Sequence, residues 1–570
     1  MSMDATNKYD AIVIGSGITG GWAAKELTEK GFKVLMLERG GEMPHGDGYQ
    51  GEHVAPWEEP YFGKNPRDLY TDEYAVQSRC YAFSEMTRHF FVNDKDDPYI
   101  RDEDKPFDWI RGYQVGGRSL TWGRQVYRFS DLDFEANKKD GHGIDWPIRY
   151  ADIKDWYSYV ERYIGVTGQA EGLPQLPDSE FLPPMEMTAP EKRFKRQVEK
   201  KYPHIRVTIG RAAILTEDKS YDWGERSACH YCGPCHRGCS TGSYFSTQST
   251  TLPAAEATGN LTLQANMVVK ELIHDDQTGR ITGVKCIDAN TMQAETISAR
   301  LVFLCASTIG STQILMNSKS AKHPNGIGGN SGALGRYLMD HTYGLSAMGV
   351  LGHDLDTIQY GNRPNGLYIP RFRNVDGEDA DVNFTRGYGY QGMALRLDWT
   401  TLGKLPGFGK NYKERVTKPG PWGIGFGGFG EALPAAGNRM MLNADQLDRF
   451  GMPQVSFNYD WTSNEVKMRT DMATQAEKML KAAGALFTIT MDEMSVPGLG
   501  IHEMGTARMG HDPKDSVLNK WNQVHDVPNL FVTDGSAMTS SSCVNPSLTY
   551  MALTARAVDY AVKQVKAGVI

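Results

Sequence analysis

The sequence lacks any apolar run long enough to cross a membrane, and it has no excess of positive charge. Its 570 residues carry 61 Lys and Arg against 69 Asp and Glu, which gives a net charge of −8 and a pI near 6.0. A membrane helix needs about 20 consecutive apolar residues, and binding to nucleic acid or anionic lipid needs a basic surface. The composition therefore predicts no membrane span and no nucleic-acid partner.

Export features and cysteine are also scarce. The first ten residues, MSMDATNKYD, lack the charged and apolar regions of a signal peptide, so we expect the chain to carry no export signal of its own. Eight cysteines in 570 residues are too few for a disulfide scaffold. Four of the eight lie between Cys229 and Cys239, so their placement tells more than their number. The length allows a sizeable core and two or more domains.

A predicted strand, a glycine-rich turn and a predicted helix follow one another early in the chain. The apolar run Ala11-Ile12-Val13-Ile14 has the length and composition of a buried parallel strand. It leads into Gly15-x-Gly17-x-x-Gly20 and then into a segment with helical periodicity. Gly15 permits the turn, Gly17 lets backbone amides approach a pyrophosphate at the helix N-terminus, and Gly20 lets helix and strand pack closely.

The next strand supplies the acidic residue that such a motif uses. It runs from Lys33 to Leu37 and ends in Glu38, about 20 positions after the glycines, where a carboxylate can accept hydrogen bonds from an adenosine ribose. A glycine-rich turn in an ordinary α/β protein is the alternative, but the strand-turn-helix context and the acid favour a dinucleotide site. The pattern leaves open whether the nucleotide is a flavin or a nicotinamide.

A second glycine-rich segment lies at 111–124, with the sequence RGYQVGGRSLTWGR. Gly116 and Gly117 are followed by a small hydroxyl residue, Ser119, and by an aromatic residue, Trp122. Such a backbone can lie against a flat ring or a phosphate, because glycine has no side chain to hinder the approach. For this segment alone, an ordinary loop turn is an equal alternative.

The clustered cysteines, Cys229, Cys232, Cys235 and Cys239, have the spacing C-x2-C-x2-C-x3-C, which matches bacterial-type iron-sulfur sites. One departure is that Ser240 follows the last cysteine, where such runs usually have proline. In two-cluster ferredoxins the fourth cysteine serves the other cluster, and this chain has no second run. Either Cys239 binds the same cluster as the other three, or one thiolate is idle and a three-iron cluster forms.

A structural zinc site is the rival interpretation of this run. Zinc accepts Cys and His alike, so His230 or His236 could take part. Zinc sites usually pair two knuckles a dozen or more residues apart, and for this reason we favour the iron-sulfur interpretation. The scattered cysteines are expected to be small buried residues and not ligands: Cys80, Cys286, Cys305 and Cys543.

The rest of the chain predicts two kinds of sheet. The near-continuous apolar run 300–308 opens onto a helix, which is typical of a strand in a parallel sheet. From 342 to about 500, abundant Tyr, Trp, Phe and Gly favour strands of an antiparallel sheet. Aromatic faces beside polar groups suit a sugar or polyol, although a single ring in a sheet more often serves packing. A helix is predicted from Ser463 to Ala483, with Ser463 as its N-cap.

Several segments along the chain form one ordered set of motifs. They are Gly15 to Gly20 with Glu38, Gly116-Gly117-x-Ser119-x-x-Trp122, LCASTIGSTQIL, LGRYLMDH, HEMGTARMG, TDGS and NPSLT. In this order they resemble the glucose-methanol-choline (GMC) oxidoreductase family of flavoproteins. The match is weak from 342 to 500, where only Phe429-Gly-Glu431 and Asn438-Arg439 fit. The resemblance implies an α/β fold, with a Rossmann-like FAD-binding domain and a discontinuous α+β substrate domain built on an antiparallel sheet.

The resemblance assigns catalytic roles by position. His502 matches the family's catalytic base, and Asn545 matches its partner, a His or Asn shortly before the last helix. Oxidation of an alcohol removes the hydroxyl proton while hydride leaves carbon for the flavin, so a neutral imidazole near that oxygen lowers the barrier. Asn545 can hydrogen-bond the same oxygen and position the carbon. Without the surrounding motif, His502 would be interpreted as a structural histidine.

The resemblance also implies FAD in the nucleotide site. Asp534 corresponds to the acidic residue at the flavin's ribityl-pyrophosphate portion, and Val268 lies where the family's backbone meets the adenine. Gly116, Gly117 and Ser119 correspond to the loop along the flavin. The predicted cofactor-binding set is completed by Gly15, Gly17, Gly20, Glu38 and Asn545.

The cysteine run brings the chain closer to one branch of this family. That branch comprises bacterial dehydrogenases, including the large subunits of gluconate, fructose and glucose dehydrogenases and of glucoside 3-dehydrogenases, in which a cluster near the flavin passes electrons on. Cys229, Cys235 and Cys239 resemble the branch's three-iron site, and Cys232 is an addition that would permit four irons. The implied function is an FAD-dependent sugar or glycoside dehydrogenase, with C3 oxidation of a glucoside as the best guess.

The branch also implies partners and a location. Its large subunits typically lack a signal peptide and are exported together with a small, signal-bearing subunit. We therefore expect such a partner, a cytochrome or quinone acceptor, and a periplasmic location by co-export, with a cytoplasmic location as the alternative. Two other hypotheses stay open: an oxidase of the same fold with a structural zinc knuckle, and a non-catalytic binding or electron-transfer subunit.

The resemblance and the composition together predict a division of the chain into three parts. The FAD-binding domain is expected to comprise 1–50, 100–170, 245–341 and 500–570, the substrate-binding domain 171–221 and 342–499, and the iron-sulfur segment 222–244.

Overall fold

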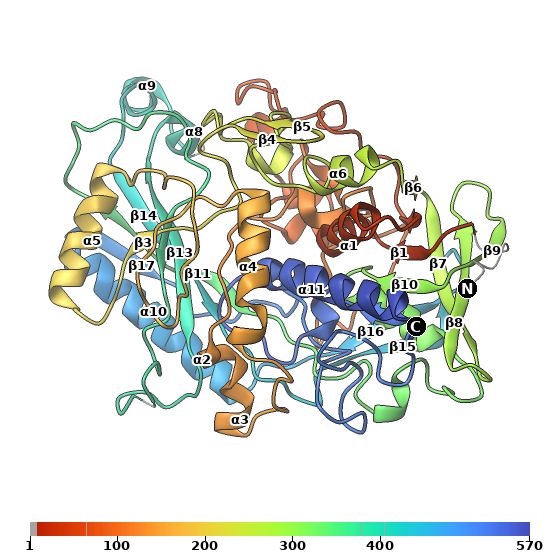
Figure 1. The fold of residues 1–570 in the computed structure, drawn as a ribbon. Helices are drawn as coiled ribbons and strands as arrows, with labels where there is room; N and C mark the ends of the chain where they lie inside the picture. Colours follow the sequence, from red (N-terminus) through yellow and green to blue (C-terminus); the bar gives the residue numbers. More distant parts are fainter. Residues whose placement is uncertain (1–7, 64, 378, 404) are drawn as a thin grey trace.

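A five-stranded parallel sheet forms the centre of one half of the molecule (Figure 1). The computed structural model describes residues 8–63, 65–377, 379–403 and 405–570. The strand order is β18-β10-β1-β2-β6, with bounds β1 Ala11–Ile14, β2 Val34–Leu37, β6 Leu261–Gln264, β10 Leu301–Leu304 and β18 Leu530–Val532. Every residue of β1 and β2 is buried, as expected for apolar strands in a sheet that is covered on both faces.

Helices surround this sheet. The first helix, α1 (Ile18–Glu29), packs on α11 (Ser547–Lys566) and α6 (Thr251–Ala257), and α11 also packs on α4 (Tyr150–Ile164). Figure 1 shows α1 and α11 side by side near the middle of the molecule, with α4 crossing beside them. Another helix, α7 (Thr308–Asn317), packs on β7 (Met267–Asp275). This strand forms a three-stranded antiparallel sheet with β8 (Arg280–Asp288) and β9 (Ala294–Ser298).

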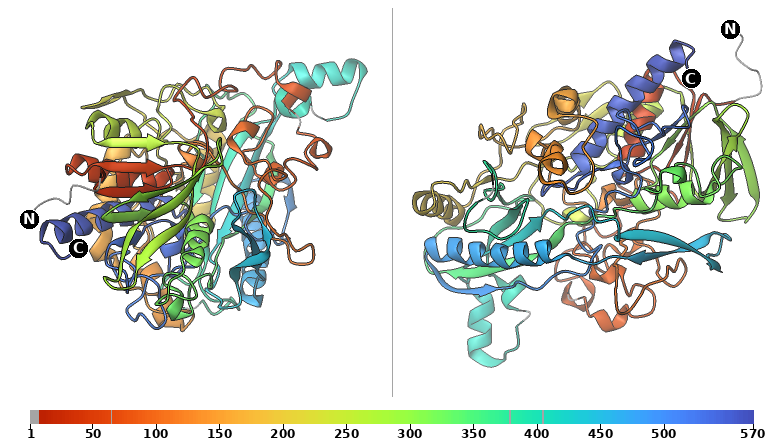
Figure 2. Two further views of the ribbon diagram at one scale, coloured as in Figure 1. Left: turned by 90° about the vertical axis from the view of Figure 1, so that its right-hand side faces the viewer. Right: turned by 90° about the horizontal axis from the view of Figure 1, so that it is seen from below.

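The other half of the molecule is built on a six-stranded antiparallel sheet. Its order is β17-β11-β14-β13-β12-β3, with bounds β3 Thr208–Ile209, β11 Thr342–Leu351, β12 Leu367–Ile369, β13 Tyr388–Arg396, β14 Trp422–Gly430 and β17 Ala485–Thr490. One face is covered by α10 (Ser463–Ala482), which packs on β11, β14 and β17 and on the neighbouring helix α5 (Ala189–Lys201). The right-hand view in Figure 2 shows α10 lying along this sheet.

The remaining elements are short hairpins, helices and turns. Two hairpins are formed by β4 (Lys219–Tyr221) with β5 (Gly224–Arg226), and by β15 (Arg439–Leu447) with β16 (Pro453–Asn458). The short helices are α2 (Asp131–Phe134), α3 (Ala136–Asp140), α8 (Trp399–Leu402) and α9 (Gly409–Thr417). The 3-10 turns are η1 (Pro60–Gly63), η2 (Arg67–Leu69), η3 (Gln77–Arg79), η4 (Arg88–Phe90), η5 (Gly117–Leu120), η6 (Cys235–Arg237), η7 (Gly329–Ser331) and η8 (Gly535–Ala537).

The predicted fold class is confirmed by this combination of a parallel sheet with helices and a separate antiparallel sheet. The helix predicted from Ser463 begins there, but its N-cap is Thr462, whose hydroxyl accepts from the Asn464 amide. Thr462 and Glu465 form a capping box, which is why the cap lies one residue before the predicted position. In the described ranges, no helix is both long and apolar enough to cross a bilayer.

The predicted domain boundaries stay a prediction. Residues 1–7 of the predicted FAD-binding domain, and residues 378 and 404 of the predicted substrate-binding domain, lie outside the described residues.

Candidate active site

A cavity of about 1070 Å³ extends from the carboxyl ends of β1 and β2 to the antiparallel sheet. Ligands of α/β proteins bind at this end of a parallel sheet. The volume exceeds the usual range for a single small ligand, about 300–1,000 Å³, so it has room for a dinucleotide together with a second molecule. Predicted site residues that line it are Gly15, Gly17, Glu38, Gly117, Ser119, Cys232, Cys235, Val268, His502, Asp534 and Asn545.

The turn between β1 and α1 is shaped as a cradle for a phosphate group. Gly15 has a φ of +94°, and a Cβ there would lie 2.5 Å from the Cys305 carbonyl oxygen, so the turn needs glycine. Gly17 has an ordinary φ of −66°, and a Cβ there would meet nothing within 4 Å. Because neither backbone nor packing demands glycine at Gly17, the space before the α1 N-terminus is what the missing side chain keeps open. No side chain caps α1, so its first N–H groups face this space.

Gly20 and Gly116 support the site without lining the cavity. A Cβ on Gly20 would lie 1.8 Å from the Gly15 carbonyl oxygen, so glycine is needed for the close contact of α1 with the turn. Gly116 has a φ of +89°, and its Cβ would lie 2.1 Å from Gln248 Oε1. Neither residue lines the cavity, and both act through the backbone path.

Glu38 lies beside the cradle at the end of β2. Its carboxylate accepts hydrogen bonds from the Ser16 amide at 3.0 Å, the Ser16 hydroxyl at 2.6 Å and the Gly40 amide at 2.9 Å. These bonds hold a nearly buried carboxylate at the position predicted to meet a ribose. The arrangement fits FAD, because an open helix N-terminus and a fixed acid stand side by side.

Asp534 and the 116–119 turn line the cavity further along. The Asp534 carboxylate accepts from Ser311 Oγ, from the Ser536 amide at 3.0 Å and from Ser536 Oγ at 2.6 Å, and burial raises its pKa. Ser119 Oγ lies 3.2 Å from Thr247 Oγ1 and accepts from the Thr247 amide. These polar groups are therefore fixed by the protein before any ligand binds. Val268 lies on β7, and it is buried at the wall of the cavity.

The loop that carries His502 is shaped by one buried carboxylate. Asp340 accepts hydrogen bonds from the backbone amides of Gly498, Gly500 and His502, at 2.9, 2.9 and 3.1 Å. It also accepts from the His341 amide at 2.9 Å. A single carboxylate thus fixes the start of the loop and the adjoining end of the LGRYLMDH motif.

The two imidazoles of His341 and His502 are hydrogen-bonded through their Nδ1 atoms, 2.8 Å apart. His341 Nε2 contacts the carbonyl oxygens of Ser541 and Ser542 at 3.2 and 2.9 Å. Carbonyl oxygens only accept, so His341 carries its proton on Nε2, and its Nδ1 accepts from His502 Nδ1–H. Neutral His502 thereby has an unprotonated Nε2, the tautomer that a general base needs.

Asn545 lies beside that unprotonated nitrogen. Its Nδ2 donates toward His502 Nε2 at 3.4 Å, and its Oδ1 accepts from Gln391 Nε2 on β13. The bond to Gln391 fixes which end of the Asn545 amide faces the imidazole. Burial, followed by the charges of His341 and Arg118, keeps the pKa of His502 well below its usual value, so the ring is neutral. The structure thus brings together the two predicted catalytic residues.

Four residues of the site were not identified from the sequence: His341, Asp340, Arg118 and Gln391. His341 and Asp340 end a motif that was recognised, so their positions were available although their roles were not. Arg118 donates to both carboxylate oxygens of Glu503, at 3.1 and 2.9 Å, beside the 116–119 turn. Gln391 lies in a region of weak resemblance, and no sequence signal pointed to it.

The cysteine run forms a loop at the edge of the same cavity. Cys229, Cys235 and Cys239 are partly buried, Cys232 is exposed, and none forms a disulfide. Burial raises the pKa values of three thiols, that of Cys235 to about 12. Within the ranges that the structure describes, no group of three or more His, Cys, Asp or Glu side chains is arranged to hold a metal ion. The iron-sulfur prediction is therefore not confirmed.

Other features of the loop concern its sulfur atoms and histidines. The Tyr231 amide donates to Cys229 Sγ at 3.4 Å, and the Tyr244 amide donates to Cys239 Sγ at 3.5 Å. Burial and the charge of Arg124 lower the pKa of His236 to about 4, so this ring is neutral. The scattered cysteines are all buried, as predicted: Cys80, Cys286, Cys305 and Cys543.

Comparison with known proteins finds similarity along nearly the whole chain. Models of the GMC oxidoreductase family match residues 9–343 and 434–554. The 2-methyl-1,2-propanediol dehydrogenase of Mycolicibacterium austroafricanum is 29% identical, covering 98% of this chain and 95% of the relative. The fructose dehydrogenase large subunit of Gluconobacter japonicus is 25% identical, covering 99% of both chains.

A solved structure has the same fold. The crystal structure of pyridoxine 4-oxidase from Mesorbium loti superposes with a TM-score of 0.56 at 14% sequence identity, covering 97% of this chain and 98% of that chain. One family model alone covers more than half of the chain, and relatives match it from end to end. The chain belongs to the GMC oxidoreductase family and is a flavin-dependent oxidoreductase of alcohols or sugars.

Proposed function

We propose that the chain is a dehydrogenase that oxidises a secondary or anomeric alcohol of a sugar or glycoside, with C3 of a glucoside as the first position to test. The observation that carries the proposal is the unprotonated Nε2 of His502, held beside the Asn545 amide in the cavity. The names of relatives, which include fructose dehydrogenase and gluconate 2-dehydrogenase, support a sugar substrate.

The chain's own residues account for the proton and for substrate positioning. The alcohol hydroxyl would donate to His502 Nε2, which removes its proton. Asn545 Nδ2 lies at the same nitrogen and can donate to the alcohol oxygen, which restricts the orientation of the carbon. Bound FAD, held along Gly17, Glu38 and Asp534, would supply the acceptor for the hydride.

We further propose that electrons leave through an iron-sulfur cluster at Cys229, Cys232, Cys235 and Cys239, with three or four irons. The thiol spacing and the backbone N–H bonds to Cys229 and Cys239 sulfur support this, since such bonds tune cluster sulfurs. Cys232 and Cys235 line the same cavity as the residues that would hold FAD, which supports electron transfer from the flavin to a cluster at this loop.

A partner subunit and an export route complete the proposal. The fructose dehydrogenase relative is named a large subunit, which supports a multi-subunit enzyme. We infer a small, signal-bearing partner, a cytochrome or quinone acceptor, and a periplasmic location by co-export. A cytoplasmic enzyme is the alternative.

An oxidase with a structural zinc knuckle is the second candidate. It is supported by the relatives named oxidases, among them paromamine 6'-oxidase of Streptomyces fradiae. Oxygen consumption without added acceptor, together with zinc and not iron in the purified protein, would favour this candidate.

The test is an anaerobic spectrum of the purified protein, titrated with methyl glucosides, lactose, fructose and gluconate. We expect flavin bleaching by at least one sugar, and iron and sulfide in the protein. The Cys235→Ser variant should lose iron and the reduction of a one-electron dye, while its flavin is still bleached. Cys286→Ser, at a buried cysteine far along the chain, is the control and should keep both. A protein without iron, or with a Cys235→Ser variant that reduces the dye normally, would contradict the cluster.

A further inference from the structure

The segment just before Asn545 contains three successive serines, Ser540, Ser541 and Ser542, and all three are fully buried. Ser540 Oγ accepts from Trp146 Nε1 at 2.7 Å. Ser541 Oγ donates to the Ala432 carbonyl at 3.1 Å and accepts from the Ala432 amide at 3.2 Å. Buried hydroxyls with such partners hold a segment in one conformation, because breaking a bond leaves a polar atom unpaired.

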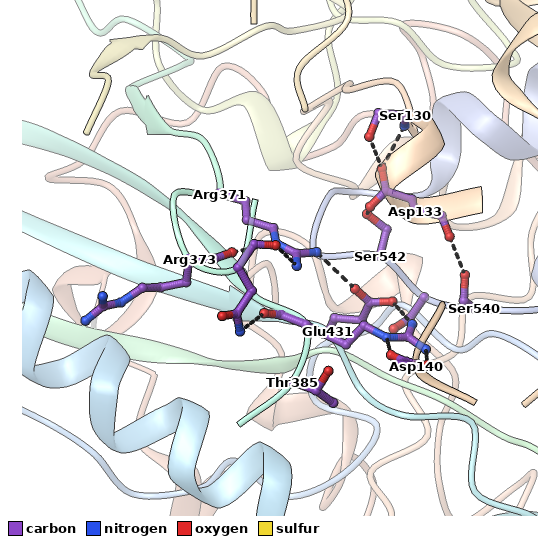
Figure 3. Close-up of polar contacts among 12 residues, drawn as sticks. Ser130, Asp133, Asp140, Arg371, Arg373, Thr385, Glu431, Ser540 and Ser542 are labelled. Carbon is purple, nitrogen blue, oxygen red and sulfur yellow. Dashed lines mark hydrogen bonds and ion pairs between the residues drawn. The ribbon is translucent and has the colours of Figure 1, made fainter. Parts of the chain in front are cut away.

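Ser542 has an unusual backbone and a charged partner. Its φ of +55° lies in the left-handed region, which a residue with a side chain adopts only where the surroundings enforce it. Its Oγ donates to Asp133 Oδ1 at 2.6 Å. The other Asp133 oxygen accepts from the Ser130 amide at 2.7 Å and from Ser130 Oγ at 2.8 Å. Figure 3 shows Asp133 between Ser130 and Ser542.

The left-handed turn at Ser542 has a chemical result. It lets the carbonyl groups of Ser541 and Ser542 converge on one donor, His341 Nε2–H. If the 541–542 peptide turned away, His341 could move its proton to Nδ1 and would then no longer accept from His502 Nδ1–H. His502 would shift to the tautomer with its proton on Nε2, which has no lone pair for the alcohol proton.

The segment is also held from the side of the antiparallel sheet. Glu431, the residue before Ala432, is fully buried and accepts from Arg386, and Arg386 also donates to Asn137 and Asp140 of α3. Figure 3 shows Arg371 on the other side of Glu431. Ser541 is thus held by Ala432, which follows the buried and paired Glu431, and Ser542 is held by Asp133, which Ser130 fixes in turn. These anchors on both sides explain how a strained residue is kept in place.

We infer that Asp133 and Ser542 are positioning residues for the catalytic base: they hold the 541–542 peptide so that His341 keeps His502 in its reactive tautomer. This rests on the proposed function in one respect, namely that His502 takes the alcohol proton. Asp133 and Ser542 act through His341, and neither is required to touch substrate or cofactor.

The test compares four variants by the rate of flavin reduction in anaerobic stopped-flow. Ser542→Ala and Asp133→Ala remove the bond, and each should slow reduction about tenfold while the substrate Kd stays within twofold. Asp133→Asn can donate from Nδ2 to Ser542 Oγ, so it should recover most of the wild-type rate. Ser540→Ala is the matched control: its buried hydroxyl contacts Trp146 and, at 3.5 Å, the main-chain carbonyl of Asp133, but not the Asp133 carboxylate that holds Ser542. It should change the rate less than twofold.

A second measurement does not depend on turnover. Nitrogen-15 spectra of histidine-labelled protein, with His341 and His502 assigned through His341→Gln and His502→Gln, report which ring nitrogen carries the proton. We expect Nδ1–H for His502 in the wild type, and loss of that single tautomer in Ser542→Ala. Equal rates for Ser542→Ala and Ser540→Ala, or an unchanged His502 tautomer in Ser542→Ala, would overturn the inference. If no alcohol reduced the flavin of the wild-type protein, the proposed function would be overturned. The nitrogen-15 spectra would still decide whether Asp133 and Ser542 fix the tautomer of His502.

Discussion

At the scale of single residues, the reactive group is a chain of hydrogen bonds and not one histidine. His502 depends on His341 for its tautomer and on Asn545 for the environment of its lone pair. These three residues lie at 341, 502 and 545, and they meet because the 498–506 loop and the 540–545 segment converge on the end of the LGRYLMDH motif. The chemistry of each residue is ordinary, and their combination gives the site its function.

Replacing His502 should slow the chemistry strongly. We expect His502→Ala to reduce flavin reduction by at least about a hundredfold, the usual scale for a general base. The measurement is the anaerobic stopped-flow rate with saturating substrate. The flavin content should equal that of the wild type, because His502 faces the cavity and the loop backbone is held by Asp340. Reduction at the wild-type rate would remove His502 from the mechanism.

The sequence supplied the identity of the site residues better than their interactions. His502 and Asn545 were predicted from motifs, and the structure brings them within 3.4 Å. The role of His341 could not be predicted, because it depends on which atoms the carbonyls of Ser541 and Ser542 face, and a pattern of residue types carries no such direction. Gln391 was missed for a different reason: aromatic and glycine-rich strands give no hint of which side chain faces a cavity.

At the scale of elements, short-range sequence patterns predicted individual strands and helices, but they did not predict which distant strands pair. The strand-turn-helix unit of β1 and α1 and the strand β2 follow from apolar runs and glycines, which act within a few residues. The predicted N-cap of α10 was off by one residue because Thr462 and Glu465 cap it reciprocally. The placement of β18 beside β10 joins residues more than 200 positions apart, and local patterns contain no information about it.

Two glycines at the β1–α1 turn have different roles: Gly17 leaves space for a ligand, and Gly20 allows close packing. Gly17→Ala should fold normally, since its Cβ meets nothing within 4 Å and its φ is ordinary. The added methyl group would occupy the phosphate cradle, so we expect FAD to bind at least about tenfold more weakly, consistent with about 1–3 kcal/mol for overpacking. Fluorescence titration of the apo-protein with FAD measures this.

Gly20→Ala is the comparison for that experiment. Its Cβ would lie 1.8 Å from the Gly15 carbonyl oxygen, so we expect loss of the folded nucleotide half and not only of FAD affinity. Far-UV circular dichroism and thermal unfolding distinguish the two effects. A Gly17→Ala protein that binds FAD as the wild type does would show that no ligand group approaches this position.

At the scale of the whole molecule, a buried ionic network joins the antiparallel sheet to helix α3. Glu431, which follows β14, pairs with Arg386, and Arg386 also pairs with Asp140 and donates to Asn137, both on α3. Arg371 lies 3.8 Å from the second Glu431 oxygen. Since buried charges need partners, the position of α3 against the antiparallel sheet is tied to these contacts.

Glu431→Gln should therefore destabilise the protein. We expect a loss of about 3 kcal/mol in the free energy of unfolding, at the lower end of the range for breaking a buried pair, because Arg386 keeps Asp140 and Asn137. Urea unfolding of the purified protein measures it. Glu477→Gln, which removes a partly exposed pair with Lys481, is the control and should cost less than about 1 kcal/mol. Equal losses in the two variants would show that the network does not bear on stability.

The order of strands in the parallel sheet has a consequence for biosynthesis. Its outer strand β18, at Leu530–Val532, pairs with β10, and helix α11 then packs against α1. More than nine-tenths of the chain must therefore be translated before β10 gains its second neighbour and the parallel sheet its last strand. Until then one edge of β10 is unpaired and the flavin cavity lacks the walls that Asp534 and Asn545 supply, so we expect the prosthetic group to bind only after nearly all of the chain has been made.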